Sequence, residues 1–324
     1  MRWLALAIAA WILSANEARA VTIVTGGILE STTWTIQGSP YFLNGDVWVQ
    51  SRGPGYPIPV LTIDPGVTVT GGGILYVGYS YPGNLKAVGT ASQRIAFTST
   101  WADPTLRGRW PGIVFGAQAS TASMLKYCTV SGAGMYSGGY LPAAGILVRS
   151  PVSFENVTVT SSGGHGFFIE DNGAAPFLKN VTVSDNTGAG IAVASGATPR
   201  LEGVSAVGNG QAGIVLEPDV TLASATGLSA TGNGVDGIEI SHLFQVTFAS
   251  SSTWKATSLP YVIRSKVWIR GSGSPTLTIE PGTAVKFSGT GELWVGTDGD
   301  STTASLQAVG TDVQRIEFTA GSCC

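Results

Sequence analysis

Short apolar triplets recur along the middle of the chain, and a glycine precedes each one. The first and third residues of every triplet are apolar, whereas the middle residue varies. Alternate side chains of a strand point to opposite faces, so this pattern predicts strands with one buried face. The glycines lie 21, 24, 23 and 24 residues apart, which predicts a solenoid with one coil per period. The five copies are Gly145-Ile146-Leu147-Val148, Gly166-Phe167-Phe168-Ile169, Gly190-Ile191-Ala192-Val193, Gly213-Ile214-Val215-Leu216 and Gly237-Ile238-Glu239-Ile240.

A second strand keeps the same period, with apolar residues inward and Ser or Thr in the outward positions that follow each turn. Between this strand and the next triplet, an asparagine recurs four residues before the glycine. Asparagine tolerates turn conformations, and stacked asparagine side chains can hydrogen-bond from coil to coil. The regular spacing therefore predicts a structural asparagine ladder rather than a catalytic row. Its members are Asn186, Asn209 and Asn233.

The middle residues of the triplets predict a strip on the outer face of the solenoid. Successive coils lie about 4.8 Å apart, so apolar side chains at this position form a contiguous strip. We expect this outer strip to be covered by a loop or used as a contact surface. It comprises Leu147, Phe168, Ala192 and Val215.

Residues 32–99 and 252–319 are copies of one another and flank central coils at 113–241. Shared segments include Leu61-Thr62-Ile63-Asp64-Pro65-Gly66, which returns as Leu277-Thr278-Ile279-Glu280-Pro281-Gly282. We refer to the copies as the first and second modules. The second module stops where the first continues, so we expect a truncated copy within one domain over 21–324. A bare terminal coil leaves unpaired strand edges, so we expect either further coils in the natural gene product or end-to-end self-association.

These repeats resemble the right-handed parallel β-helix proteins of the pectate-lyase-like superfamily. The resemblance covers nearly all of the chain after its first twenty residues. The LxAVGT…RIxFT pattern of the modules, at Leu85 to Thr98 and Leu306 to Thr319, is similar to that of large β-helical surface proteins of bacteria. The resemblance implies an all-β, right-handed parallel β-helix. It leaves the activity open, because the superfamily includes lyases, hydrolases, adhesins and surface proteins without known activity.

The N-terminus and the composition indicate export. An apolar run from Trp3 to Leu13 precedes Ala18-Arg19-Ala20, which predicts a signal peptide over 1–20 cleaved after Ala20. The run is too short to span a bilayer, and the mature chain is expected to have no membrane span. Charged residues make up 11% of the chain and the net charge is −3, which gives no basic face for nucleic acid. The chain is therefore expected to be secreted or at the cell surface.

Three residues are candidates for catalysis. Gly164-His165-Gly166 matches a tripeptide of polygalacturonase-like β-helix hydrolases, but the carboxylates and the Arg-x-Lys of that family do not accompany it. We therefore interpret His165 as a structural turn residue. Glu170 and Glu217 occupy equivalent positions two coils apart, and we interpret them as solvated surface glutamates. No catalytic site is predicted.

Candidate binding residues are aromatic. Trp101 and Trp110 lie near two arginines in an irregular loop and are candidates for exposed ligand contacts, as is Phe168 on the outer strip. The tryptophans that recur in both modules are interpreted as core or coil-packing residues rather than sugar platforms. These are Trp34, Trp48, Trp254 and Trp268.

Asp298-Gly299-Asp300 has the form of a short calcium loop, with Asp298 and Asp300 as the candidate ligands. The first module has Tyr79-Ser80-Tyr81 in its place. The three cysteines, Cys128, Cys323 and Cys324, show no metal spacing and no paired framework. We therefore predict neither a metal nor a cofactor.

The sequence favours an exported β-helix with a structural, adhesive or glycan-binding role, whose partners are polysaccharides or other cell-surface components. The alternative is a polysaccharide lyase or glycoside hydrolase of the same fold. A third hypothesis is an ice- or mineral-binding face of outward threonines. Convergent carboxylates in a groove would favour the enzyme, and an exposed aromatic or apolar stripe would favour adhesion.

Overall fold

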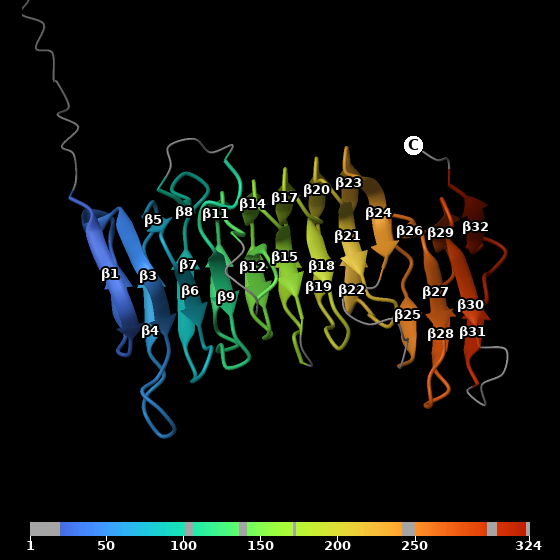
Figure 1. Ribbon diagram of the computed structural model, residues 1–324, viewed down its shortest axis with the longest axis horizontal. Helices are drawn as coiled ribbons and strands as arrows, with labels where there is room; N and C mark the ends of the chain where they lie inside the picture. Colours follow the sequence, from blue (N-terminus) through green and yellow to red (C-terminus); the bar gives the residue numbers. More distant parts are fainter. Residues whose placement is uncertain are drawn as a thin grey trace, which may run out of the picture.

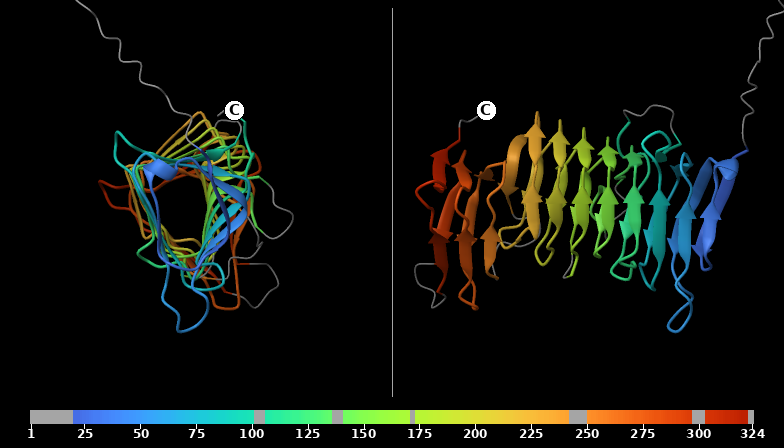
Figure 2. Two further views of the ribbon diagram at one scale, coloured as in Figure 1. Left: turned by 90° about the vertical axis from the view of Figure 1, so that its left-hand side faces the viewer. Right: turned by 180° about the vertical axis from the view of Figure 1, so that it is seen from behind.

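The chain forms a solenoid of parallel strands in a computed structural model. The structure describes residues 20–100, 106–135, 141–170, 173–241, 250–296 and 303–321. These residues form 32 strands and one short 3-10 helix, η1 (Ile36–Gly38), and every strand pairing between them is parallel. In Figure 1 the strands follow one another along the long axis, and the left view of Figure 2 looks along the axis around which the coils wind. No helix in the described ranges has the length and apolarity to cross a membrane.

The coils of the N-terminal and central parts of the chain build three rows of strands, and the two longest strands, β1 and β3, each run through two of the rows. Row A contains the first part of β1 (Thr22–Ile28) and of β3 (Tyr41–Val49), then β5 (Thr68–Gly71), β8 (Ile95–Ser99), β11 (Cys128–Ser131), β14 (Thr158–Thr160), β17 (Thr182–Ser184), β20 (Ser205–Val207) and β23 (Ser229–Thr231). Row B contains the second part of β1 and β3, then β6 (Ile74–Val77), β9 (Gly112–Phe115), β12 (Ala144–Val148), β15 (His165–Ile169), β18 (Ile191–Val193), β21 (Ala212–Leu216) and β24 (Val235–Ile240). Row C contains β2 (Thr32–Trp34), β4 (Val60–Ile63), β7 (Asn84–Val88), β10 (Met124–Lys126), β13 (Ser153–Glu155), β16 (Phe177–Lys179), β19 (Arg200–Glu202) and β22 (Ser224–Thr226).

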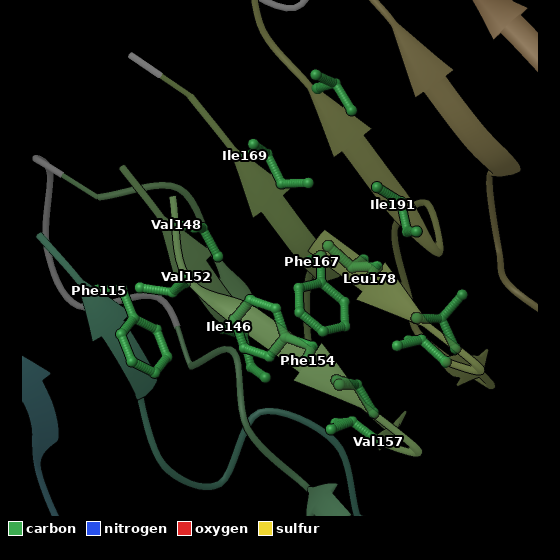
Figure 3. Close-up of a cluster of buried hydrophobic side chains, with 14 of the residues drawn as sticks. Phe115, Ile146, Val148, Val152, Phe154, Val157, Phe167, Ile169, Leu178 and Ile191 are labelled. Atoms are coloured by element: carbon green, nitrogen blue, oxygen red, sulfur yellow. The ribbon is translucent and has the colours of Figure 1, made fainter. Parts of the chain in front are cut away.

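The inward side chains of the three rows form one continuous core. The triplet residues predicted to point inward are buried, as Ile146 and Val148 illustrate with no exposed surface. Aromatic rings from different rows meet on the axis: the Phe154 ring centroid lies 5.6 Å from that of Phe115 and 5.0 Å from that of Phe167 (Figure 3). The alternation in the sequence therefore gave the correct buried face.

The predicted asparagine ladder is confirmed. Asn186 Nδ2 donates to Asn209 Oδ1 at 2.8 Å, and Asn209 Nδ2 donates to Asn233 Oδ1 at 2.7 Å. Asn186 and Asn209 are buried. The ladder continues into the backbone, because Ser162 N donates to Asn186 Oδ1 at 2.9 Å. These bonds tie the corners between rows A and B of successive coils.

The outer strip is aligned in register, as predicted, and it is buried. Its four residues stack from β12 to β21, and their exposed fractions are only 2, 2, 0 and 4%. Leu141 packs against the first of them together with Val114, and alanines such as Ala189 and Ala212 surround the last two. The strip is therefore buried, and it offers little contact surface.

The second module is attached to the central coils through row B, and its strands do not occupy the same rows as their counterparts in the first module. It contains β25 (Ser252–Trp254), β28 (Thr276–Ile279) and β31 (Ser305–Ala308) in one sheet, β27 (Lys266–Ile269) and β30 (Glu292–Val295) in another, and β26 (Tyr261–Ile263), β29 (Ala284–Phe287) and β32 (Glu317–Ala320) in continuation of row B. Tyr261 pairs with Ile238 of row B, whereas its counterpart Tyr41 pairs with Val69 of row A. Among the described residues, rows A and C end at β23 and β22, and row B alone crosses the junction.

Candidate functional site

The outward row that carries the buried strip becomes aromatic and accessible towards the N-terminus. Trp48 on β3 pairs with Tyr76 on β6, and this row then continues through Val114 to Leu147. The rings of Trp48 and Tyr76 are parallel, with centroids 6.0 Å apart, and both residues are partly exposed. The ring of Tyr79 lies 4.8 Å from that of Tyr76, and this residue is 40% exposed. We call Trp48, Tyr76 and Tyr79 the aromatic shelf.

A glycine turn after β6 places Tyr79 on the shelf. Gly78 has φ +60°, a conformation that favours glycine, and any Cβ there would collide with the backbone of Ala119. Gly116 on the next coil has no room for a Cβ either, because the backbone of Gly78 and Tyr79 lies against it. Two close backbone approaches therefore fix the turn from which the tyrosine projects.

An ion pair borders the shelf. Arg149 follows β12, and its Nε and Nη2 donate to the same oxygen, Oε1 of Glu170, at 2.9 and 2.5 Å. The two side chains keep 23 and 16% of their surface exposed. Burial alone would lower the pKa of Arg149, but the hydrogen bond and charge of Glu170, helped by the Tyr79 hydroxyl, raise the pKa of Arg149 above its usual value. The guanidinium is therefore a permanent cation beside the tyrosine.

The phenol of Tyr76 stays neutral at physiological pH. Burial, and then the charges of Asp46 and Tyr79, raise the pKa of Tyr76 to about 12 although Arg149 opposes them. Asp46 is fixed nearby, since its Oδ1 accepts a hydrogen bond from Ile74 N at 2.9 Å. The shelf thus combines apolar ring surface with hydroxyl groups, a carboxylate and a cation, which is the mixture that a polar ligand with apolar faces requires.

His165 lies at the start of β15, where its position agrees with a structural role. Its Nδ1 accepts a hydrogen bond from Ala189 N on the next coil at 3.0 Å, and its ring lies 5.5 Å from that of Phe168. Burial lowers the pKa of His165 to about 4. The imidazole is therefore neutral at physiological pH and links two coils.

The interpretation of Glu170 and Glu217 as solvated surface glutamates is wrong. Glu170 is held by Arg149, and Glu217 is only 2% exposed. Glu217 Oε2 accepts from Ser195 N at 2.7 Å, and the Ser195 hydroxyl contacts both Glu217 and Asp219. The carboxylates of Glu217 and Asp219 therefore converge on Ser195, in a contact between neighbouring coils.

Two of the aromatic candidates are not accessible. Trp110 is 1% exposed within the main core, and its Nε1 donates to Ser131 O at 2.9 Å. Its ring enters the core beside Gly71, where any side chain would collide with it. Phe168 is 2% exposed because the outer strip is covered. Trp101, Asp298 and Asp300 lie outside the described residues.

The repeated tryptophans divide between the two packing roles predicted for them, core packing and packing between coils. Trp34 and Trp254 are core residues as expected, and they stack on Tyr41 and Tyr261. Trp48 and Trp268 instead point outward on their strands and are partly exposed. Recurrence in a repeat indicated a shared environment, but it did not distinguish the inner face from the outer one.

A separate shallow cavity lies at the N-terminal end of the solenoid. It has a volume of about 480 Å³ and is bounded by the loop after β3, where Tyr56 is 58% exposed. Arg52 and Glu30 both line it and form an ion pair, with Nη2 of the arginine 2.8 Å from Oε1 of the glutamate. No local pattern in the sequence indicates this cavity, because its lining comes from two loops about 25 residues apart.

Within the described ranges, no three His, Cys, Asp or Glu side chains group together in a way that would hold a metal ion. Cys128 is a free thiol inside the core, where burial raises its pKa to about 12. It is therefore a packing residue rather than a nucleophile or ligand.

Comparison with known proteins assigns the chain to a family. Residues 111–284 match the family described as the right-handed beta helix region, and because this match spans more than half of the chain, the chain belongs to that family. No curated protein matches the chain. Among solved structures, the A-module of the mannuronan C-5 epimerase AlgE4 of Azotobacter vinelandii is similar over 93% of this chain and 91% of that chain, with 12% identity and a TM-score of 0.38. The family describes a fold that hosts different functions, so function has to be argued from the site.

The sequence analysis named Trp48 as a packing residue but did not bring the residues of the shelf together. The four residues Trp48, Tyr76, Tyr79 and Arg149 come from three coils, with Tyr76 and Tyr79 on the same one, and are separated by up to about a hundred residues. The available signal was that Trp48 and Tyr76 occupy the alternate positions of their strands whose side chains point outward. These positions place both rings on the same outer face as the middle residues of the triplets.

Proposed function

We propose that this protein is an exported β-helix that binds a saccharide chain on the aromatic shelf. The observation that carries the proposal is the partly exposed run of Trp48, Tyr76 and Tyr79 beside the Arg149–Glu170 pair. Sugar rings have apolar C–H faces that pack on aromatic rings, and their hydroxyl groups match the phenol, carboxylate and guanidinium groups at the border. Export, which the N-terminus predicts, would bring the shelf to extracellular polysaccharides.

The test is a glycan array on the 21–324 protein, followed by calorimetric titration of the best binder. Truncating a ring that stacks on the ligand removes a central contact, so W48A and Y79A should each weaken binding at least about tenfold. Y79A is the safer variant for folding, because Tyr79 is already 40% exposed. Far-ultraviolet circular dichroism of each variant verifies that the fold is retained.

Y56A is the matched control, since Tyr56 is an exposed tyrosine in the separate N-terminal cavity. It should leave the affinity unchanged. Absence of any saccharide ligand, or binding that depends on Tyr56 and not on Tyr79, would contradict the proposal. Release of reducing or unsaturated ends in the same samples would instead favour the lyase or hydrolase alternative.

A further inference from the structure

The second module carries an aromatic pair at the position of Trp48 and Tyr76. Trp268 on β27 pairs directly with Trp294 on β30, as Trp48 on β3 pairs with Tyr76 on β6. The centroids of the two indoles lie 4.9 Å apart with an interplanar angle of 39°, and Trp294 is 39% exposed. The repeat therefore presents an outward aromatic pair twice, once in each module.

The charged residues that flank Trp48 and Trp268 in the sequence have opposite signs. The residues two positions before and after Trp48 are Asp46 and Gln50, whereas those around Trp268 are Lys266 and Arg270. Side chains at i−2 and i+2 of a strand lie on the same face as residue i. The first pair is thus flanked by a carboxylate and the second by two cations.

Both cations lie against the indole rings. Lys266 Nζ is 4.2 Å from the ring centroid of Trp294 and 5.3 Å from that of Trp268, and Arg270 Cζ is 4.8 Å from the Trp268 centroid. One carboxylate accompanies them: Glu292 Oε2 lies 3.3 Å from Lys266 Nζ and accepts a hydrogen bond from Trp294 Nε1 at 2.5 Å. The cluster keeps a net positive charge, since Lys266 and Arg270 outnumber Glu292.

Arg270 has unused donor capacity. Its Nε is buried yet has no hydrogen-bond partner, and Arg270 makes no ion pair with any acidic residue of the described ranges. A buried donor without a partner costs free energy and calls for an acceptor. The guanidinium lies against the Trp268 ring, and its Nη groups form no ion pair with a carboxylate of the described ranges, so they can serve as donors to a ligand.

We propose that Trp268, Trp294, Lys266 and Arg270 form a subsite for a sugar that carries a tetrahedral oxyanion, a sulfate or phosphate ester. The indoles take the apolar face of the sugar, and the ester accepts hydrogen bonds from Arg270 and Lys266. A tetrahedral oxyanion suits two cationic donors better than a planar carboxylate does, because three oxygens are available to approach from separate directions. This inference rests on the proposed function, since it assigns the ligand class of the second aromatic pair.

The test titrates the 21–324 protein with three probes at low salt. They are a sulfated galactan oligosaccharide, its chemically desulfated counterpart, and a mannan oligosaccharide carrying phosphate monoesters. We expect an ester-bearing probe to bind at least about tenfold more tightly than the desulfated one. The sulfated and phosphorylated probes distinguish the two sources of the oxyanion. The preference should shrink as salt is added, because the contact is ionic and partly exposed.

K266Q and R270Q should each remove most of this preference, and K266Q protects the test against misfolding because Lys266 is exposed. The matched control is K286Q, since Lys286 is an exposed lysine on β29 rather than on β27 or β30. A preference for esters that survives both K266Q and R270Q, or is absent from the native protein, overturns the inference.

The two proposals can fail separately. If binding of the desulfated probe depends on Tyr79 but no ester preference exists, the shelf stands and the subsite falls. If no probe responds to W48A or Y79A while K266Q and R270Q abolish binding of the ester, the subsite stands and the shelf falls.

Discussion

The first and second modules share a sequence pattern but differ in what surrounds their last coil. Leu85 and Phe97 of the first module have no exposed surface, whereas their counterparts Leu306 and Phe318 are 38 and 47% exposed. The strands that carry them have the same register in both modules: β7 and β8 stack on β4 and β5 as β31 and β32 stack on β28 and β29. Sequence alone therefore does not determine burial in this fold.

The next coil accounts for the difference. In the first module, β10 and β11 pair with the outer edges of β7 and β8 and cover the core side chains beneath them. Among the described residues, no strand pairs with the outer edge of β31 or β32. A solenoid residue is thus buried by its neighbours along the axis as much as by its own coil.

The strongest test of this comparison truncates the equivalent phenylalanines. F97A opens a cavity in a closed core and should lower the free energy of unfolding by about 3–5 kcal/mol. F318A removes a ring that is already half exposed, so its cost should be about 1 kcal/mol or less. Urea unfolding followed by circular dichroism measures both. Equal losses would show that the last coil is covered in solution.

A second test uses the equivalent arginines. Arg94 Nη2 donates to Cys128 O at 2.7 Å and to Asn156 O at 2.8 Å, and so ties its coil to the next two. Arg315 is exposed. R94Q should therefore cost about 2 kcal/mol, because charge-assisted bonds to buried carbonyls are lost, whereas R315Q should stay within about 0.5 kcal/mol. The same urea titration applies, and a loss in R315Q as large as in R94Q would contradict the comparison.

The smallest expected effect concerns mild acid and belongs to the central coils, since neither module contains a histidine. Burial lowers the pKa of His165 to about 4, below its value in the unfolded chain. Between about pH 6.5 and 4 the unfolded state binds the proton more readily, so stability falls as the pH falls, by roughly 1 kcal/mol near pH 5.5.

H165Q isolates this contribution, because glutamine can accept the bond from Ala189 N but does not titrate. The melting temperature of the native protein should therefore fall relative to that of H165Q as the pH is lowered from 7 to 5. Parallel curves would mean that the imidazole is not buried as described.

The fold could be predicted from the sequence because two features recur along the repeat, the apolar alternation within the triplets and the spacing of the turn residues. Apolar parity within each triplet identified the inward residues, and the spacing of Asn186, Asn209 and Asn233 identified a ladder that the hydrogen bonds confirm. Both signals are local and periodic. The alternation of inward and outward residues also predicted the outer strip. Leu141, on the segment before β12, packs against the cluster that contains its first residue, Leu147.

The candidate site was less predictable because it depends on contacts between coils. Nothing local in the sequence indicates that Trp110 turns into the core beside Gly71, or that Arg149 reaches Glu170 on the next coil. The change of row at Tyr261 is also invisible in the sequence, since the module that carries it repeats the first module closely. Such features depend on how a coil docks on its predecessor.

The junction before the second module has a mechanical consequence. Coils of the central region are joined by three ladders of backbone hydrogen bonds, but the second module is joined by the ladder between β24 and β26, with side-chain bonds such as that from Trp254 Nε1 to Pro218 O at 3.4 Å. Tension applied along the long axis is shared among three ladders in the central coils, whereas among the described residues only one ladder carries it across this junction. Under load the second module would separate first as an intact unit, while the central coils keep their stack.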